Sequence, residues 1–481
     1  MFFTRRQLAC PLGGGLLPVA AGKLDGWLDE HDVLDGSPFL LDPGGRYDVA
    51  LNRYFLAGLG LLAANTQAAA AYDLKKFLAF LQDNRGGRSW RDATAADRAA
   101  FRQWRLADPG GPRVALTTWD REVATVSEFY RWAVQERYVS VSPVVQRQSR
   151  GRDPRRGAGG TPAEASHQGP RNNLVWLPAG VYRQWRDVGV RGFTVAGLPD
   201  PGFRGRYASR NAAYADLMLR TGLRLSEQTS LSVFEVPEAV PGVAFARTWL
   251  PGPIAKGSSA RAVYIPAASL KDIQDYVEIE RADAAGRARQ AGRYEQIRDP
   301  LIVEDRARPV VITGGQRVKV SGLGHAERAR LLIRVPGGLE PAALWLNEQG
   351  MPSRPSGWRE VFGNASDRCA RLGLRVACHP HALRHSFAVI TLEQLWRGHI
   401  QELAVMNPAQ RQTYQMVFGD PLNWVRVRLG HRSIETTQIY LHTLQELEME
   451  TRMALVPGDW EPAGIHPADL SEAAAGGAPG G

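Results

Sequence analysis

The sequence is poor in cysteine, and two other features are missing. Of its 481 residues only Cys10, Cys369 and Cys378 are cysteine. That is too few for a disulfide framework, and such sparse use fits a reducing compartment. No apolar run approaches the ~20 residues that a membrane-spanning helix needs. The phosphate-loop pattern G-x-x-x-x-G-K-[ST] is absent as well, so we do not expect nucleotide hydrolysis.

Lysine is also scarce, although the chain is basic. Its 59 basic residues outnumber the 49 acidic ones, which gives a formal net charge of +10, yet only six of the 59 are lysines. Nearly all of the positive charge is therefore arginine, and this excess favours a polyanionic partner. A hydrophobic content of 44% and a charged content of 22% are those of an ordinary globular protein. The length allows two or three domains.

Composition and periodicity divide the chain into segments. The start, rich in Gly and Pro, predicts an irregular extension, although Thr4-Arg5-Arg6 superficially resembles an export signal. Helical periodicity follows, then an Arg-rich and Gly-rich stretch typical of a linker. The boundaries that we predict are 1–44 for the extension, 45–145 for a helical domain, 146–170 for a basic flexible linker, 171–456 for a second domain and 457–481 for a disordered tail.

Two segments near the end of the second domain carry unusual chemistry. The first contains His381-Ala-Leu-Arg384-His385, where His381 and Arg384 are three residues apart and share a helix face. The second is L-G-H-x-S-x-x-T-T-x-x-Y, from Leu429 to Tyr440. Its glycine is typical of a helix end, and its serine of the N-cap of the next helix. Arginine matches phosphate with a planar charged fork, and a tyrosine hydroxyl can act as a nucleophile.

Together these motifs resemble the tyrosine recombinase (phage integrase) family. The resemblance implies a mainly α fold with a small β-sheet or hairpin (α+β), in which a SAM-like core-binding domain precedes a catalytic domain. T-G-L-R-L-S-E matches the motif of the first catalytic arginine and places it at Arg224, with Glu227 one turn later as a supporting residue. A-K-G-S-S-A-R matches a hairpin lysine of the family at Lys256. His385 is a further supporting residue.

The resemblance implies a role for each member of this set. Tyr440 attacks a phosphate of duplex DNA and forms a 3′-phosphotyrosyl bond, without metal, ATP or cofactor. Free tyrosine has a pKa of about 10 and needs help to lose its proton. His381 is the expected base or proton relay, and Lys256 the acid for the leaving 5′-oxygen. The remaining three residues, Arg224, Arg384 and His431, would stabilise the phosphorane.

The expected partners are recombination sites in DNA and further copies of this chain, assembled as a tetramer. The location that we expect is therefore cytoplasmic and nucleoid-associated. Whether the helix after Tyr440 packs in cis or onto a neighbouring subunit stays open. Candidate phosphate contacts are Lys75, Lys76, Arg121, Arg131, Arg147 and Arg150.

Two stretches are longer than the compact form of the family requires. We interpret residues 285–345 and 392–420 as insertions. In the first we expect strands at Val310–Ile312 and Val318–Val320, and a helix at Ala326–Ile333. The second insertion separates Arg384 from His431, which must meet in the site. Two alternatives use the same residues: a type IB topoisomerase, or an inactive DNA-binding protein on the same fold.

Overall fold

A computed structural model describes residues 1–4, 30, 33, 36–147, 161–166, 174–406, 410 and 420–455. The chain divides into two compact units, Met1–Pro170 and Arg171–Gly481. The predicted tail, and Arg150 in the predicted linker, lie outside the described residues. Among the described residues, no helix combines the length and apolar character needed to cross a membrane.

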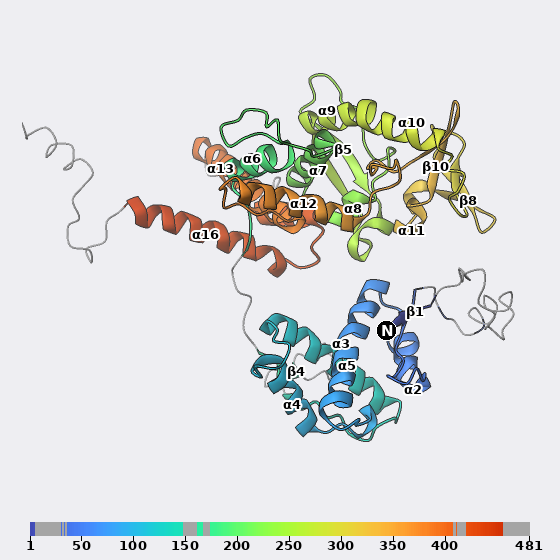
Figure 1. Cartoon of the computed structure of the whole chain (residues 1–481). Helices are drawn as coiled ribbons and strands as arrows, with labels where there is room; N and C mark the ends of the chain where they lie inside the picture. The colour runs from blue at the N-terminus through green and yellow to red at the C-terminus, as the bar shows by residue number, and fades with distance from the viewer. Residues whose placement is uncertain are drawn as a thin grey trace, which may run out of the picture. The chain divides into compact units, whose positions relative to one another are not determined.

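The first unit is a helical bundle (Figure 1). Its core is aromatic: Phe77, Phe101, Trp119, Phe129 and Tyr130 have no exposed surface. The long helices begin where the chain turns from extended to helical dihedrals, and Thr94 caps one of them through a capping box with Asp97. The helices are α2 (Val49–Arg53), η2 (Tyr54–Gly58), α3 (Ala64–Asn84), η3 (Trp90–Asp92), α4 (Ala95–Leu106) and α5 (Leu116–Gln135).

Two short strand pairs in this unit were not predicted from the sequence. Strand β1 (Phe2–Phe3) pairs with β2 (Pro38–Phe39), so the first residues pack onto the helical unit. Strand β3 (Gln146–Arg147) pairs with β4 (Thr161–Pro162). The second pair lies inside the stretch predicted as a flexible linker, and the described ends of that stretch are therefore structured.

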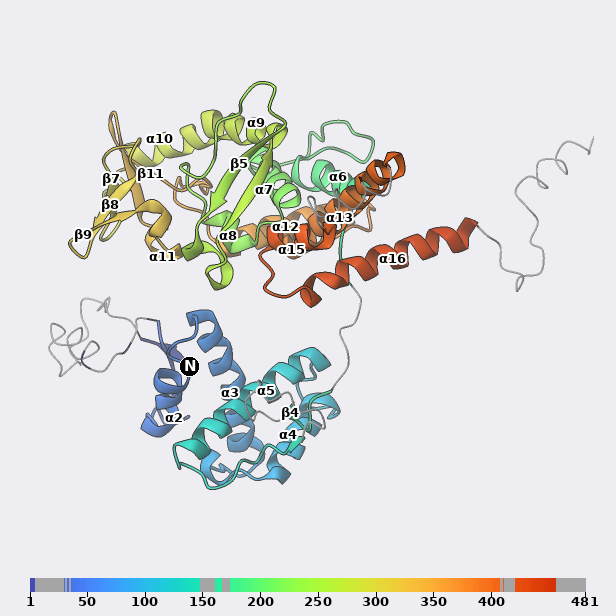
Figure 2. The same cartoon turned by 180° about the vertical axis from the view of Figure 1, so that it is seen from behind.

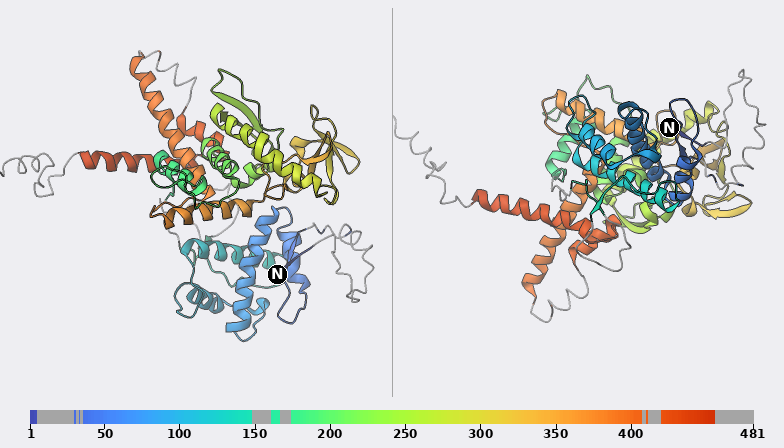
Figure 3. Two further views of the ribbon diagram at one scale, coloured as in Figure 1. Left: turned by 45° about the horizontal axis from the view of Figure 1, so that its top comes forward. Right: turned by 90° about the horizontal axis from the view of Figure 1, so that it is seen from below.

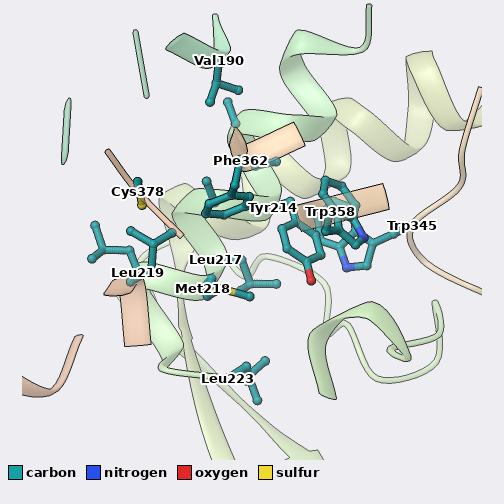
Figure 4. Close-up of a cluster of buried hydrophobic side chains, with 14 of the residues drawn as sticks. Val190, Tyr214, Leu217, Met218, Leu219, Leu223, Trp345, Trp358, Phe362 and Cys378 are labelled. Carbon is teal, nitrogen blue, oxygen red and sulfur yellow. The ribbon is translucent and has the colours of Figure 1, made fainter. Parts of the chain in front are cut away.

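The second unit packs helices around a strongly buried helix, α7 (Ala208–Thr221). Beside this helix the rings of Tyr214 and Trp358 stack 3.5 Å apart, with Trp345 at their edge (Figure 4). The other helices are α6 (Ala179–Gln184), η4 (Trp185–Val190), α8 (Leu225–Thr229), η5 (Gly252–Ile254), η6 (Lys256–Ser258), α9 (Ala267–Tyr276), η7 (Val277–Arg281), α10 (Ala282–Gln290), α12 (Pro355–Arg371), α13 (Pro380–Val405), α15 (Pro421–Leu429) and α16 (Glu435–Leu455).

A β-hairpin and two long helices complete the frame of the site. Strands β5 (Phe245–Leu250) and β6 (Arg261–Pro266) pair antiparallel, and η6 lies in the turn between them. Helices α13 and α16 diverge from the body of the unit (Figures 2 and 3). This helix-rich fold with small sheets confirms the predicted α+β class.

The segment interpreted as the first insertion forms a β-rich subdomain. Strand β10 pairs parallel with β7 and antiparallel with β11. Strands β8 and β9 correspond to the two predicted strands and pair antiparallel with each other, although Val320 lies outside β9. The predicted helix at 326–333 is wrong in its second half, because Leu331–Ile333 are buried strand residues beside β7. The elements are β7 (Leu301–Val303), β8 (Val310–Thr313), β9 (Gln316–Lys319), η8 (Val320–Gly322), α11 (His325–Arg328), β10 (Leu331–Val335) and β11 (Gly338–Pro341).

Candidate active site

Arg384 occupies the centre of the candidate site. It lies one turn into α13 and is only 2% exposed. Its Nη1 donates to the carbonyl of Gly222 and its Nη2 to the carbonyl of Leu429, the latter at 2.5 Å. Burial and the positive charge of Arg224 lower the pKa of Arg384 to about 9. The guanidinium is therefore cationic at neutral pH, and helix-end carbonyls compensate its burial.

Two glycines shape the helix ends that hold this arginine. Gly222 ends α7 and Gly430 ends α15, and both adopt the left-handed conformation, with φ values of 63° and 64°. This geometry is costly for other residues. It confirms the helix end predicted at Gly430. Helix α16 begins at Glu435, so Ser433 is not its N-cap as predicted; its hydroxyl lies 3.3 Å from that of Thr436.

A buried carboxylate organises the other cations. Glu227 has no exposed surface and accepts hydrogen bonds from Arg224 Nη1 at 2.9 Å and Arg261 Nη2 at 2.6 Å. Burial would raise the pKa of Glu227, but the hydrogen bond and charge of Arg261 outweigh it and lower the pKa to about 2. The carboxylate is therefore ionised, and it fixes Arg224 at the start of α8.

Arg261 is the residue that sequence reasoning missed. It is 4% exposed, and it joins β6 to α15 by donating from Nε to the carbonyl of Arg428 at 2.8 Å. Its spacing five residues after Lys256 is visible in the sequence. Its pairing with Glu227 spans 34 residues and carries no local signal.

Lys256 lies in the tight turn between β5 and β6. Its backbone N–H donates to Glu227 Oε1 at 3.3 Å, and its side chain is exposed. Gly257 follows with φ of 65° and accepts from Arg432 Nη2 at 3.1 Å. The turn is thus tied both to Glu227 and to the segment after α15, and the charge of Lys256 acts on His381.

His431 and Tyr440 approach from the segment that follows α15. His431 Nε2 lies 3.2 Å from Arg384 Nη2, and its Nδ1 lies 3.0 Å from Thr437 Oγ1. Burial and the charge of Arg384 lower the pKa of His431 to about 3, so its ring is neutral. The contact with Arg384 brings together two residues that are separated in sequence by the segment 392–420, which we interpret as an insertion.

Tyr440 is buried near two imidazole rings. It is 2% exposed, and burial raises the pKa of its hydroxyl. The His431 ring lies nearly parallel to it, with centroids 6.3 Å apart. The Tyr440 hydroxyl lies 3.0 Å from His385 Nδ1. The His381 ring in turn lies 4.2 Å from the His385 ring.

The predicted catalytic set therefore converges on one place in the second unit. Arg224, Arg384 and His431 supply donors that suit a phosphate, because fixed cations and N–H groups match its oxygens. The buried carboxylate, Glu227, is already bound by two arginines. Among the described residues, no group of three or more His, Cys, Asp or Glu side chains could hold a metal ion.

The candidate DNA contacts of the first unit have a mixed placement. Lys75 and Arg147 are exposed. Lys76 donates to Glu122 at 2.9 Å, Arg121 to Asp73 at 2.5 Å, and Arg131 to Glu128 at 2.8 Å. The carboxylates of Glu122 and Asp73 are buried, so Lys76 and Arg121 also compensate buried charges within the first unit. The sixth candidate, Arg150, lies outside the described residues.

Comparison with known proteins identifies the class. Residues 52–137 match the family model of the phage integrase N-terminal SAM-like domain. Tyrosine recombinase XerC of Lactobacillus delbrueckii subsp. bulgaricus is 24% identical over 388 residues, covering 80% of this chain and 91% of the relative. Tyrosine recombinase XerD of Bifidobacterium longum is 32% identical over 138 residues, covering 28% of this chain and 34% of the relative.

Solved structures of recombinases are similar at lower identity. XerH bound to a palindromic difH substrate is 14% identical with a TM-score of 0.46, covering 90% of this chain and 89% of that one. A lambda integrase (75-356) dimer bound to a COC' core site is 12% identical with a TM-score of 0.41, covering 81% of this chain and 93% of that one.

The family model and the full-length relatives define a two-part DNA recombinase with a SAM-like domain ahead of a catalytic unit. The chain belongs to the tyrosine recombinase family, and it is a tyrosine-type site-specific recombinase.

Proposed function

We propose that this protein is the integrase or transposase of a mobile element, and that it cleaves and rejoins duplex DNA through a 3′-phosphotyrosyl intermediate. One observation carries the proposal. A buried tyrosine lies in the same small site as Arg224, Arg384 and His431, although these residues span more than half of the second unit's sequence. That combination suits nucleophilic attack on a phosphodiester.

The chemistry follows from the side chains. The Tyr440 oxygen forms a bond to phosphorus while the bond to the 5′-oxygen breaks, and the leaving oxygen takes a proton from Lys256. Arg224 and Arg384 bind the non-bridging oxygens, and His431 adds a hydrogen bond to the same phosphorane. Each fixed donor of this kind is worth about 3–4 kcal/mol. The bond energy stays in the protein–DNA link, so rejoining needs no ATP and the proposed mechanism uses no metal.

His381 serves as base or proton relay in this proposal. Burial and the charge of Arg384 lower the pKa of His381, so its ring is neutral at pH 7 and can accept a proton.

Binding is proposed to involve both units, on DNA inside the cell. Lys75, Lys76, Arg121, Arg131, Arg147 and Arg150 are the proposed phosphate contacts of the first unit and its linker. The recombinases of known structure named above are bound to DNA, and by analogy the acting assembly is a tetramer on two sites in the cytoplasm, at the nucleoid.

The test is covalent trapping. The protein is incubated with nicked duplexes tiled from the DNA that flanks its own gene, in EDTA, and separated on denaturing gels. We expect an adduct with the wild-type protein and none with Tyr440→Phe, which should still bind DNA. A requirement for a divalent metal would contradict the mechanism, and loss of DNA binding in Tyr440→Phe would contradict a purely chemical role for the hydroxyl.

Trapping tests the inactive alternative, and a second assay, the joining of two different duplexes, tests the topoisomerase alternative. A type IB topoisomerase would relax supercoiled plasmid without joining two different duplexes, whereas the recombinase joins them. An inactive DNA-binding protein would form no adduct on any duplex.

A further inference from the structure

The hydroxyl of Tyr440 is held by a histidine that has no assigned role in cleavage. His385 Nδ1 lies 3.0 Å from Tyr440 Oη. Hydrogen bonds among the described residues include none between Tyr440 and His381, whose ring contacts that of His385 at 4.2 Å. The order in space is therefore Tyr440, then His385, then His381.

Local structure explains this order. His385 follows Arg384 directly on α13 and is one helical turn beyond His381. Tyr440 packs in a cluster that joins α13, α15 and α16, with Leu392 and Val425 among its buried members. The packed ring gives the hydroxyl little freedom, so the imidazole of His385 meets it in a fixed geometry.

Electrostatics decide whether His385 can accept a hydrogen in this contact. The titratable and charged groups that face His385 are His379, His381 and Arg384 from the start of α13, and His431 and Tyr440 from the segment after α15. Burial and the neighbouring His381 lower the pKa of His385 to about 3. The imidazole is therefore neutral at pH 7, and its Nδ1 can accept the hydrogen of the Tyr440 hydroxyl.

We propose that His385 is the direct proton acceptor and positioning residue of Tyr440, with His381 one step further from the nucleophile. The inference rests on the proposed function. In the forward step the Oη proton moves to His385 Nδ1, an Oη lone pair forms the bond to phosphorus, and the P–O5′ bond breaks. The electron pair of that bond stays on O5′, which takes a proton from Lys256. In the reverse step the imidazolium of His385 returns its proton to Oη.

DNA binding favours this transfer. The positive groups around His385 oppose its protonation in the free protein, and a bound phosphate brings negative charge next to the same groups. An opposite charge at this distance raises the basicity of a histidine. The acceptor therefore becomes effective only when the phosphate is in place, which would protect the nucleophile from needless ionisation.

The first test measures the contact itself, without DNA. A fluorotyrosine is incorporated at position 440, and its hydroxyl is titrated by fluorine NMR in the full chain. We expect His385→Ala to shift both the resonance and the hydroxyl pKa. His442→Asn, an exposed histidine two residues after Tyr440, is the control and should shift neither. An unchanged titration in His385→Ala would overturn the proposal.

The second test measures proton transfer in cleavage. In His385→Asn, the side-chain oxygen takes the place of Nδ1 as an acceptor but cannot carry a proton. We expect the single-turnover rate of adduct formation to fall about 100-fold, with DNA affinity and melting temperature unchanged. The hydroxyl of fluorotyrosine ionises more readily. Placed at position 440, it should raise the rate of adduct formation of His385→Asn by at least ~10-fold and change the wild-type rate little.

Each result distinguishes between the two proposals. A wild-type rate in His385→Asn, or an equal effect of fluorotyrosine in both proteins, would overturn the role of His385 while adduct formation still supports the proposed function. Absence of any wild-type adduct would overturn both the phosphotyrosyl mechanism and the proton transfer to His385. The fluorine titration would then test only the hydrogen bond between His385 and Tyr440.

Discussion

Glu227 is the residue on which the positive charges of the site depend. It has no exposed surface, and it binds Arg224 and Arg261 on its two sides. Without it, Arg261 would remain buried with its charge uncompensated, and Arg224 would lose its orientation. The residue thus links stability to catalysis, because one carboxylate serves both the hairpin and the start of α8.

Replacing this carboxylate by its amide tests both roles. Glu227→Gln should lower the free energy of unfolding by about 3–5 kcal/mol, the usual effect of breaking a buried ion pair, and should slow adduct formation more than 10-fold. Chemical denaturation and single-turnover cleavage measure the two effects. The matched control is Glu304→Gln, an exposed partner of Arg334, which should leave both unchanged.

The same residue predicts how stability depends on pH. The folded pKa of Glu227, about 2, lies below its ordinary value of 4.5. Its contribution is therefore complete above pH 4.5 and is lost as the pH falls to about 2. The lowered pKa of Glu227 corresponds to a stabilisation of the folded state by about 3 kcal/mol at neutral pH. Denaturation between pH 7 and pH 3 should show a smaller slope in Glu227→Gln than in the wild-type protein; equal slopes would mean that other carboxylates carry the acid sensitivity.

Of the two helix ends that hold Arg384, the one at Gly222 should tolerate a side chain less well than the one at Gly430. A Cβ there would lie 2.3 Å from Phe387 Cδ1, and the backbone has a positive φ. Since the carbonyl of Gly222 binds Arg384, Gly222→Ala should reduce both stability and cleavage. We expect the backbone strain alone to lower the free energy of unfolding by at least ~1–2 kcal/mol. Gly286→Ala in α10, where a Cβ meets nothing within 4 Å, is the control and should stabilise slightly; similar losses in both variants would contradict this account.

A buried arginine helps to attach the β-rich segment, which we interpret as an insertion, to the residues that follow α8. Arg328 donates to both oxygens of Glu235, at 3.0 and 2.9 Å, and to the carbonyls of Ser230, Leu323 and Val320. These contacts use every donor of the guanidinium. The segment Ser230–Glu235 directly follows α8, so the insertion braces the element that begins at Arg224.

Arg328→Met should therefore weaken the attachment of this segment. Removing the cation leaves Glu235 buried without its partner, at a cost of about 3–5 kcal/mol, and limited proteolysis should cut within 301–341 first. Arg334→Met, which removes an exposed pair with Glu304, should leave the digestion pattern unchanged. Cleavage elsewhere in the chain before the insertion is cut would contradict the bracing role.

Local signals in the sequence predicted the elements better than the contacts between them. The strands at Val310 and Val318 and the helix end at Gly430 follow from periodicity and glycine chemistry, and the structure has them. Arg261 and the strand at Leu331–Ile333 were missed, because a buried pairing across 34 residues and a parallel pairing with β7 depend on the fold. Spacing brought His381 and Arg384 onto one helix, but only the fold places His385 against Tyr440.

On the scale of the whole molecule, each unit has a core of its own. One core contains Phe77 and Trp119, and the other contains Tyr214 and Trp345. Units with separate cores unfold as separate cooperative transitions. Residues 161–166 of the predicted linker pack on the first unit: Trp119 Nε1 donates to the carbonyl of Glu164, and Ser166 Oγ donates to Asp120.

Glu164 should therefore matter to the stability of the first unit alone. Arg98 has no exposed surface and lies among three aromatic rings, and its one ion pair in the described structure is with Glu164 at 3.0 Å. Burial lowers the pKa of Arg98, which shows how unfavourable its charge is there. Glu164→Gln should lower the free energy of unfolding of the first unit by about 3 kcal/mol and leave the transition of the second unit in place.

Two fragments test the same contact by removing the whole segment instead of one side chain. A fragment of residues 1–170 keeps residues 161–166 and should unfold cooperatively. A fragment of residues 1–150 lacks Glu164, and its loss of stability should be at least as large as that of Glu164→Gln, because it also exposes the face of Trp119. Glu128→Gln, an exposed pair with Arg131 on α5, is the matched control and should behave like the wild type. Calorimetry of the full chain and both fragments measures these differences. Equal stability of the two fragments would mean that residues 151–170 do not stabilise the first unit.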